Sequence, residues 1–328
     1  MLMVTDLLAD CLRGEVARQL AGLPLDVDAA QLPRIRRVFI EAGLAAARDR
    51  STAASWVQFN LAPEPERQPP VYDWLNAVAR ELLAAGRARN FFFMHKEPGL
   101  RVRFEASDGE VGALRAELER RFAERGGWRL SPLGVVYEPE QYLFGGHASM
   151  GHVHRLFTVD SLAWLDHYAR RPGPRGEAAA WRVSLLLLRE VISGLGVVGW
   201  EHRGVWEAVR EDTGRRLPDG AHGEEAGGGE RAGWQRAVEG IRLFWERSGE
   251  EMLASFPGEE RESLAERAVA VGEAARQWRT GYFESGTATT GPRRAAAFAV
   301  IFHWNRARMS YARQCLLAEA LAGDEGAR

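Results

Sequence analysis

The last long helical pattern in the sequence carries two side chains suited to proton chemistry. His303 and Arg306 are three positions apart, so they share one face if residues 292–321 form a helix. Phe302 and Met309 can cover another face as core, which leaves the polar pair to be explained. A histidine on that face could deliver or remove a proton during catalysis. The alternative is a histidine that is hydrogen-bonded by a neighbour inside a packed bundle.

The segment before this helix, WRTGYFESGTATTGP, is rich in aromatic and hydroxyl side chains. Tyr282 could donate a proton, while Ser285 and Thr287 could hold an amide. Trp278 could stack on a flat ring of a substrate. Loops on rigid scaffolds often carry function, which favours this interpretation. The alternative is a helix that stops at Gly281 and is followed by an exposed polar loop.

Residue types that commonly bind metals or cofactors occur elsewhere in the sequence, but their spacing does not suit that role. His152 and His154 occupy alternate positions, but no cysteine or third spaced histidine accompanies them. Cys11 and Cys315 are too far apart to suggest a metal site or a disulfide framework. The sequence has no Gly-x-Gly-x-x-Gly after a strand, no Gly-Lys-Ser/Thr loop and no His-Glu-x-x-His. We therefore expect neither a metal nor a cofactor.

Length and charge restrict the class of protein. The 328 residues, 46% of them apolar, are enough to bury a large core. The 43 Lys and Arg residues nearly balance the 45 Asp and Glu residues, so neither nucleic acid nor membrane lipid is an expected partner. Acids and an arginine interrupt the apolar residues of the N-terminus, unlike a signal peptide, and no apolar run reaches the length of a membrane span. We expect a cytoplasmic protein with a neutral or peptidic substrate.

Hydrophobic periodicity predicts an α+β fold in three parts. Residues 1–50 should form helices, residues 51–146 a mainly antiparallel sheet lobe with helices, and residues 147–328 a helical lobe. The expected strands are 56–61, 90–95, 100–105 and 128–138. The expected helices are 72–85, 111–125, 161–169, 181–192, 233–247, 264–278 and 292–321. The segment 212–233 is rich in Gly and charge, so we expect a mobile loop there.

Three stretches occur in a characteristic order. FFFMHKEPGLRVRF, residues 91–104, contains an aromatic strand, a Pro-Gly turn and an Arg-x-Arg strand. VVYEPEQYLFGGHASMGHVHRLFTVDS, residues 135–161, contains a tyrosine, a glutamate, paired glycines and Phe-x-x-Asp-Ser. FHWNRARM, residues 302–309, groups His, Asn and Arg. Together they resemble the thiopeptide-type bacteriocin biosynthesis proteins, relatives of the lantibiotic dehydratase C-terminal elimination domain.

This resemblance implies chemistry on dehydroamino-acid peptides. Some members remove glutamate from glutamylated Ser or Thr. Stand-alone members of thiopeptide pathways join two dehydroalanines by a formal [4+2] aza-cycloaddition, then lose water and the leader peptide to give a pyridine and a macrocycle. Eliminating members hold the glutamate carboxylates with two arginines, whose positions here correspond to His95 and Leu143. Because leucine offers no donor, the resemblance favours the pyridine synthase.

The resemblance also implies a partner and site residues. The partner is a ribosomal precursor peptide with a leader and a core of azoles and dehydroalanines, on which Trp278 would stack. Tyr137, His95 and Arg101 are expected to line the substrate site with Trp278 and Thr287, and no cofactor is needed. Glu140 can pair with an arginine of the Arg-x-Arg strand and lock the strands. The arginines expected to attract an acidic leader are Arg34, Arg36 and Arg37.

Two other functions stay open. The first is a glutamate-eliminating dehydratase component that forms dehydroalanine. The second is a catalytically silent subunit that binds the leader and presents the peptide to another enzyme. A homodimer is compatible with each of them. Holding both dehydroalanines in a near-attack geometry can supply roughly 7–11 kcal/mol to ring closure, so positioning is the largest contribution that we expect of a synthase.

Overall fold

A computed structural model describes residues 43, 55–63, 71–97, 99–130, 137–216 and 228–323. The chain divides into two compact units, residues 1–48 and 49–328. The second unit contains every element described below. The helices expected over residues 1–50 lie outside the described residues except for Gly43. The same holds for the three arginines expected to bind a leader, Arg34, Arg36 and Arg37.

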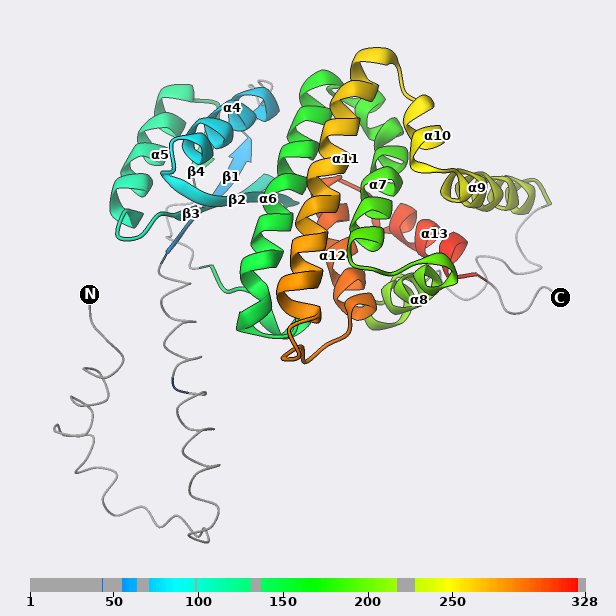
Figure 1. The fold of residues 1–328 in the computed structure, drawn as a ribbon. Helices are drawn as coiled ribbons and strands as arrows, with labels where there is room; N and C mark the ends of the chain where they lie inside the picture. The colour runs from blue at the N-terminus through cyan, green and yellow to red at the C-terminus, as the bar shows by residue number, and fades with distance from the viewer. Residues whose placement is uncertain are drawn as a thin grey trace, which may run out of the picture. The chain divides into compact units, whose positions relative to one another are not determined.

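An antiparallel sheet with two helices opens the second unit (Figure 1). Its elements are β1 (Trp56–Pro63), α4 (Val71–Ala84), β2 (Ala88–Lys96), β3 (Gly99–Ala106), α5 (Val111–Arg125) and β4 (Trp128–Leu130). The strand order is β2-β3-β1-β4, so the β-α-β-β-α-β sequence folds in the ferredoxin-like manner. The predicted α+β fold with an antiparallel sheet is confirmed.

Both faces of this sheet are covered, which explains its apolar strands. Phe59 of β1 faces α5, with its ring 5.2 Å from that of Phe122. Trp56 lies on the other face, with its ring 4.9 Å from that of Tyr137. Phe92 of β2 is fully buried and packs on the same side as Trp56, at 5.4 Å. A sheet covered on both faces needs apolar residues on both faces, as the aromatic run of β2 provides.

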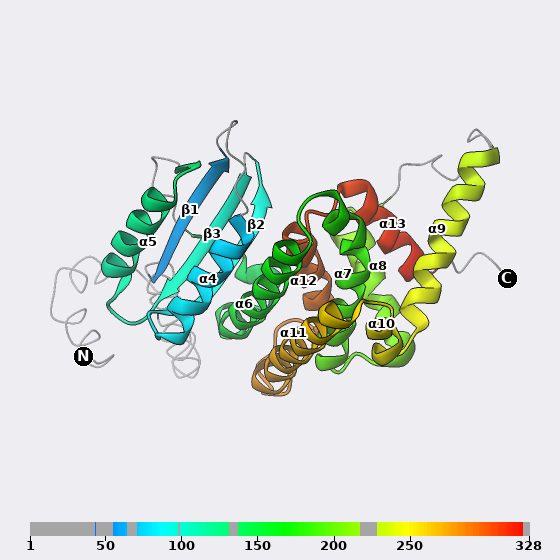
Figure 2. The same cartoon turned by 90° about the horizontal axis from the view of Figure 1, so that it is seen from above.

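Helices make up the rest of the unit (Figure 2). They are α6 (His147–Arg170), α7 (Pro174–Gly194), α8 (His202–Asp212), α9 (Gly228–Glu246), α10 (Gly249–Ala254), α11 (Gly258–Trp278), α12 (Pro292–Arg306) and α13 (Tyr311–Ala322). Short 3₁₀ turns lie at Gln141–Leu143 (η2) and Gly199–Glu201 (η3), and a π-helix at Arg279–Phe283 (η4). The predicted helices 161–169 and 181–192 are parts of the longer α6 and α7. The sequence pattern did not predict α8 and α10.

The single helix predicted over residues 292–321 is wrong. The helix ends at Arg306 and a new one begins at Tyr311. Arg308 between them has φ 47°, a conformation that continues no helix. The hydroxyl of Tyr168 donates to the carbonyl of Ala307 at 2.6 Å, which satisfies an acceptor freed by the break. The side chain of Ser310 caps the new helix.

Two predicted boundaries also differ from the structure. The strand expected over residues 128–138 ends at Leu130 as β4, residues 131–136 lie outside the described part, and Tyr137 and Glu138 are not in a strand. The helix expected from residue 233 begins at Gly228, so the connection after α8 is shorter than the predicted loop 212–233. Residues 217–227 of that loop lie outside the described part.

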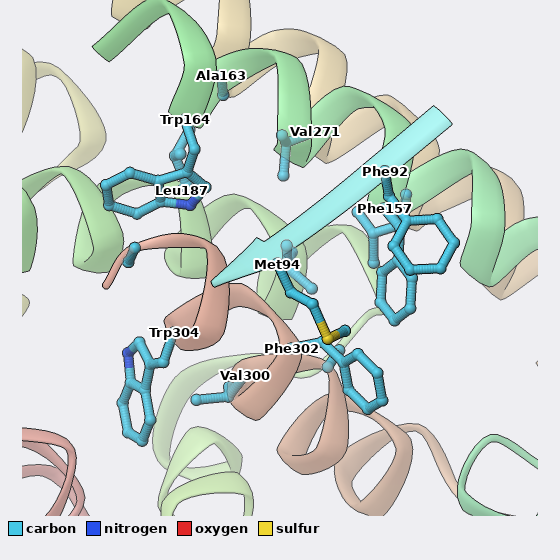
Figure 3. Packing of buried hydrophobic residues seen from close by; sticks show 14 of the residues in the cluster. Phe92, Met94, Phe157, Ala163, Trp164, Leu187, Val271, Val300, Phe302 and Trp304 are labelled. Carbon is cyan, nitrogen blue, oxygen red and sulfur yellow. The ribbon is translucent and has the colours of Figure 1, made fainter. Parts of the chain in front are cut away.

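One continuous core joins the sheet to the helices (Figure 3). Phe92 of β2 packs against Phe157 of α6 at 5.4 Å between ring centroids. Phe157 in turn stacks on Phe302 of α12 at 5.0 Å. Further along, the rings of Trp206 and Trp304 stack at 6.2 Å. Because α6 contacts β2, α4, α11 and α12, it holds the sheet and the helices together.

No single helix within the described ranges is long and apolar enough to cross a membrane. Residues 174–194 and 199–212 pass that test only as a pair, with a bend of 118° between them. Most apolar residues of α7 are buried in this unit, as in the core helix of a globular protein.

Hydroxyl groups of α6 complete the hydrogen bonding of the β2 edge. The backbone N–H of Phe91 donates to Thr158 Oγ1 at 3.0 Å, and that of Phe93 donates to Ser161 Oγ at 3.3 Å. All four groups are buried. Edge strands expose unpaired N–H groups unless another element covers them. Thr158 and Ser161 therefore fix α6 against the sheet.

Thr158→Val should destabilise the protein by about 1–3 kcal/mol, because it leaves the buried N–H of Phe91 without an acceptor at nearly constant volume. The free energy of unfolding from urea titration measures this loss. Thr280→Val is the matched control, since the hydroxyl of Thr280 is exposed and donates to backbone carbonyls at the end of the preceding helix, α11. Equal effects of the two substitutions would show that the bond to Phe91 contributes nothing.

Candidate functional site

The predicted Tyr282 loop is held by the Tyr282 hydroxyl itself. Tyr282 lies in η4, and its hydroxyl donates to the carbonyl of Gly145 at 2.8 Å. It also accepts the backbone N–H of Thr289 at 2.9 Å. Gly145 has φ 88°, and a Cβ there would overlap the Tyr282 hydroxyl. The phenol therefore ties the paired glycines to the loop, and glycine is required for this close approach.

The two other hydroxyls of the loop are exposed. Ser285 Oγ donates to the carbonyl of Tyr282 at 2.7 Å and lies 2.8 Å from Thr287 Oγ1. The backbone N–H of Thr287 donates to Ser285 Oγ at 3.3 Å. Both side chains lie at the surface.

Trp278 does not fit the stacking role. It is fully buried at the end of α11, and its indole N–H donates to Ser149 Oγ at 2.7 Å. Its ring packs against Phe144 at 6.0 Å and Phe283 at 5.3 Å. An indole enclosed in this way presents no face to a substrate, so its structural role is to fix the start of α6 to the loop.

His303 and Arg306 do share a face of α12, and both bind Asp160 of α6. Arg306 Nε donates to Asp160 Oδ2 at 2.6 Å, and His303 Nδ1 lies 2.8 Å from Asp160 Oδ1. The guanidinium of Arg306 also lies 4.6 Å above the ring of Phe157. Burial alone would raise the pKa of Asp160, but His303 and Arg306 outweigh it and hold that pKa below its usual value.

The same histidine has the neighbours of a hydrolytic triad. Its Nε2 lies 3.0 Å from Ser184 Oγ of α7, so Ser184, His303 and Asp160 follow in the order of nucleophile, base and acid. All three are buried, and Ser184 Oγ also accepts the indole N–H of Trp304 at 3.1 Å. His303 and Trp304 already satisfy the hydroxyl of this serine inside the core, so its hydrogen bonding calls for no substrate. The contacts of His303 and Arg306 with Asp160 and Ser184 hold α6, α7 and α12 together. The role of His303 and Arg306 is therefore to position these helices.

A second polar group lies on the inner face of the sheet, and sequence reasoning missed most of it. Arg103 of β3 is buried, and its Nε donates to Gln58 Oε1 of β1 at 2.6 Å. Its guanidinium lies 4.6 Å above the ring of Tyr137. The hydroxyl of Tyr137 is 2.8 Å from Nε2 of His154, which the ring of Trp56 contacts at 4.6 Å. Tyr137 was predicted as a site residue, and its neighbours were not.

This group holds three buried donors that have no hydrogen-bond partner among the residues that the structure describes. They are Trp56 Nε1, Gln58 Nε2 and Arg103 Nη1. Burial lowers the pKa of Arg103 to about 10, against the opposite influence of Tyr137 and Glu140, so the guanidinium stays charged at neutral pH. Unpaired buried donors cost free energy and call for an acceptor. We call Trp56, Gln58 and Arg103 the donor cluster; it suits a carboxylate or a polarised amide oxygen.

The remaining predicted residues occupy other environments. Arg101 Nε donates to Asn60 Oδ1 at 3.2 Å across the β1–β3 pair. His95 Nε2 lies 3.0 Å from the hydroxyl of Tyr72, and Nδ1 lies 3.2 Å from the carbonyl of Asn305. Burial, with a further contribution from Arg308, lowers the pKa of His95 to about 3. His95 is thus neutral at pH 7 and cannot replace an arginine as a charged ligand of a carboxylate.

Leu143 lies in η2 and packs against the core. The described residues contain no group of three or more His, Cys, Asp or Glu side chains arranged to hold a metal ion. Of the two histidines at alternate positions, His154 contacts Tyr137 and His152 lies beside Gly281. Each of them therefore faces a different neighbour.

The buried histidines predict a loss of stability in acid. Burial lowers the pKa of His154 from 6.5 to about 3, so the unfolded chain binds more protons between these values. The contribution of neutral His154 is therefore complete above pH 6.5 and is lost as pH falls. At pH 5 it should have lost about 2 kcal/mol. Urea titrations at pH 7 and pH 5 measure the change, and His154→Gln should reduce it by about that amount, leaving the part that buried His95 contributes. An unchanged pH dependence in that variant would refute the assignment.

A sequence signal for the donor cluster exists in the strand pairing. Gln58 lies opposite Arg103 in the β1–β3 register, and Trp56 lies two positions from Gln58 on the same face. Polar residues at alternate positions normally mark a solvated face. Here α6 and Tyr137 bury that face, which only the tertiary structure reveals.

Comparisons with known proteins agree with this fold. Residues 56–323 match the family model described as lantibiotic biosynthesis dehydratase C-term. Among solved structures, the chain is similar to the tRNA-dependent lantibiotic dehydratase MibB from Microbispora sp. 107891, with a TM-score of 0.54 and 20% identity over 82% of this chain. The match covers 27% of the MibB chain, so this protein spans about a quarter of that dehydratase.

A second solved structure, TsrL, is 14% identical over 80% of this chain and 98% of its own, with a TM-score of 0.28, too low to carry an argument. No curated protein matches the chain. The likeness to MibB shows the fold alone, whereas the family model covers most of the sequence. The chain belongs to the lantibiotic biosynthesis dehydratase C-terminal family.

Proposed function

We propose that this protein is a pyridine synthase of thiopeptide biosynthesis. It joins two dehydroalanines of a leader-bearing precursor peptide by a formal [4+2] aza-cycloaddition, then releases water and the leader as a carboxamide. The observation that carries the proposal is the replacement of both carboxylate-binding arginines expected of an eliminating relative. Leu143 has no donor, and His95 is neutral and bonded to Tyr72 and the carbonyl of Asn305.

The donor cluster suits the first step of this reaction. An amide beside one dehydroalanine must take an iminol-like form before it reacts, and charge develops on its oxygen. Donors aimed at such an oxygen in a dry site stabilise the transition state. Arg103 Nη1, Gln58 Nε2 and Trp56 Nε1 are buried and have no hydrogen-bond partner among the described residues, so this role requires that the bound peptide open the face of the sheet that Tyr137 and α6 cover.

The Tyr282 loop suits the positioning of the peptide. Ser285 and Thr287 are exposed, and Tyr282 fixes their loop to the Gly145 turn. The segment from Tyr137 to Gly145 touches the donor cluster at one end and this loop at the other. A peptide bound along that segment could therefore contact both groups. The two dehydroalanines of that peptide would then be held close together. Such positioning contributes more to the rate than stabilisation of charge by the donor cluster.

A glutamate eliminase is the second candidate, and Arg103 favours it. A buried guanidinium with an unpartnered Nη1 can hold one carboxylate oxygen. An eliminase would also need a second arginine for the other carboxylate of the glutamate, and Leu143 stands at that position. The two candidates differ in the substrate that they consume, which makes them separable.

The test supplies two peptides to the purified chain. The first has a leader and an azole-bearing core with two dehydroalanines, and the second has glutamylated serines in the same positions. A macrocycle and a free leader carboxamide, detected by mass spectrometry from the first peptide, support the synthase. Loss of glutamate from the second supports the eliminase. Binding of the peptides across several leaders without either product points to a silent presenting subunit and overturns the proposal.

A further inference from the structure

The outer face of the sheet carries a groove between α4 and α5, on the side away from the donor cluster. Its volume is about 410 Å³, within the range of small-ligand sites. We call it the α4–α5 groove, and it is lined by Trp74, Val78, Arg120, Arg121, Glu124 and Arg125. The lining holds three arginines and one glutamate, but glutamates pair with Arg120 and Arg121, so the positive charge without a counterion among the described residues is that of Arg125. The groove therefore offers one guanidinium without a counterion, and a second in a weak surface pair, to an acidic partner.

The arginines of the groove differ in what holds them. Arg121 forms ion pairs with Glu81 of α4 at 2.5 Å and with Glu117 of α5 at 2.6 Å. These pairs hold its side chain in place between the two helices. Among the described residues, Arg120 pairs with Glu124 of its own helix alone, and both side chains are more than half exposed. Such a pair is weak and exchanges readily with another carboxylate. Arg125 forms no ion pair with any described residue.

The floor of the groove is apolar. Trp74 is partly exposed, and its ring lies 5.1 Å from the buried ring of Phe122 beneath it. Val78 continues this floor one turn further along α4. A flat aromatic surface beside guanidinium groups can bind an apolar side chain and a carboxylate at the same time. Peptide segments in which acidic and apolar residues alternate provide both groups.

We propose that the α4–α5 groove docks an acidic segment of the precursor peptide. A carboxylate pairs with Arg125 and with Arg120 after it leaves Glu124, and an apolar side chain of the peptide covers Trp74. A peptide fits better than a nucleic acid because the lining contains apolar Trp74 and Val78 and the carboxylate of Glu124, which repels phosphate. The identity of the peptide as a biosynthetic precursor rests on the proposed function, whereas the binding of an acidic peptide does not.

Fluorescence anisotropy tests the docking with a short labelled peptide that alternates glutamate with leucine and phenylalanine. The same peptide with glutamine at every glutamate is its control. We expect the acidic peptide to bind more tightly, with a preference that falls as salt rises. Arg125→Glu should weaken it by about fivefold, as removal of one exposed ion pair does. Arg216→Glu, the same charge change at an exposed arginine of another surface, should leave binding unchanged.

A charge exchange gives the decisive result. In the Arg120→Glu/Arg125→Glu variant, a peptide with lysine in place of glutamate should bind better than it binds the original chain. Thermal unfolding of each variant shows whether it is folded. Equal affinity for the acidic peptide in all variants overturns the inference, and so does an RNA oligonucleotide that displaces it while the glutamine peptide binds equally well.

The outcome is separable from that of the proposed function. With a leader-bearing precursor, Arg125→Glu should raise KM by a similar factor and leave kcat unchanged, because the groove is remote from the donor cluster. Docking without any product would remove the proposed function and keep the groove. Normal product formation with an unchanged KM in Arg125→Glu would remove the groove and keep the function.

Discussion

Asp160→Asn should lower the free energy of unfolding by about 3–5 kcal/mol, the range found when one partner of a buried ion pair is removed. Asp160 is the buried carboxylate that faces Arg306, which is itself buried. Asparagine keeps the shape but leaves the guanidinium uncompensated in the core. Urea titration followed by tryptophan fluorescence measures the loss.

Two further variants separate charge from packing. Asp160→Asn combined with Arg306→Met should be more stable than the single variant, because the uncompensated charge has gone. Glu273→Gln, which breaks the exposed pair with Arg276, should change stability far less. If Asp160→Asn and Glu273→Gln had equal effects, the buried network would not hold α6, α7 and α12 together.

Local patterns were sufficient for most of the sheet lobe. The aromatic run of β2 and the Pro-Gly signal after it predicted two paired strands, and β2 and β3 meet across Lys96 and Gly99. The break after Arg306 could not be predicted in this way. The residues around it favour a helix, and the turn depends on contacts such as that of Tyr168 with the carbonyl of Ala307. A tertiary contact there overrides the local preference.

The same limit applies to the candidate site. The spacing of His303 and Arg306 predicted that they share a face, and they do. Their common partner, Asp160, lies 143 positions from His303, so the sequence alone could not show that the pair is held in the core. The aromatic side chain of Trp278 is of a type that often binds ligands, but the structure buries it in the core. Arg103 shows the reverse, a buried position without the partners that a structural arginine needs.

Arg103→Met should reduce product formation by about 100-fold, the effect of losing one preorganised donor in a dry site. Methionine fills a similar volume and keeps contact with the rings of Phe92 and Tyr137, but it cannot donate to substrate. Arg103→Lys should form product at a rate between those of the original protein and Arg103→Met, since lysine keeps the charge and loses the planar set of donors. Rates with both peptides show which reaction depends on Arg103.

The free energy of unfolding of Arg103→Met should stay the same or rise, while its activity falls. Arg103 has Gln58 as a partner and, within the described part of the chain, no carboxylate in hydrogen-bond contact, so its buried charge opposes folding. Arg103→Met should therefore unfold at an equal or higher urea concentration while its turnover falls, as residues kept for function often do. A purely structural arginine would give the reverse: lower stability with turnover unchanged in the fraction that folds. The donor cluster thus has a role in catalysis only if activity and stability separate in this one variant.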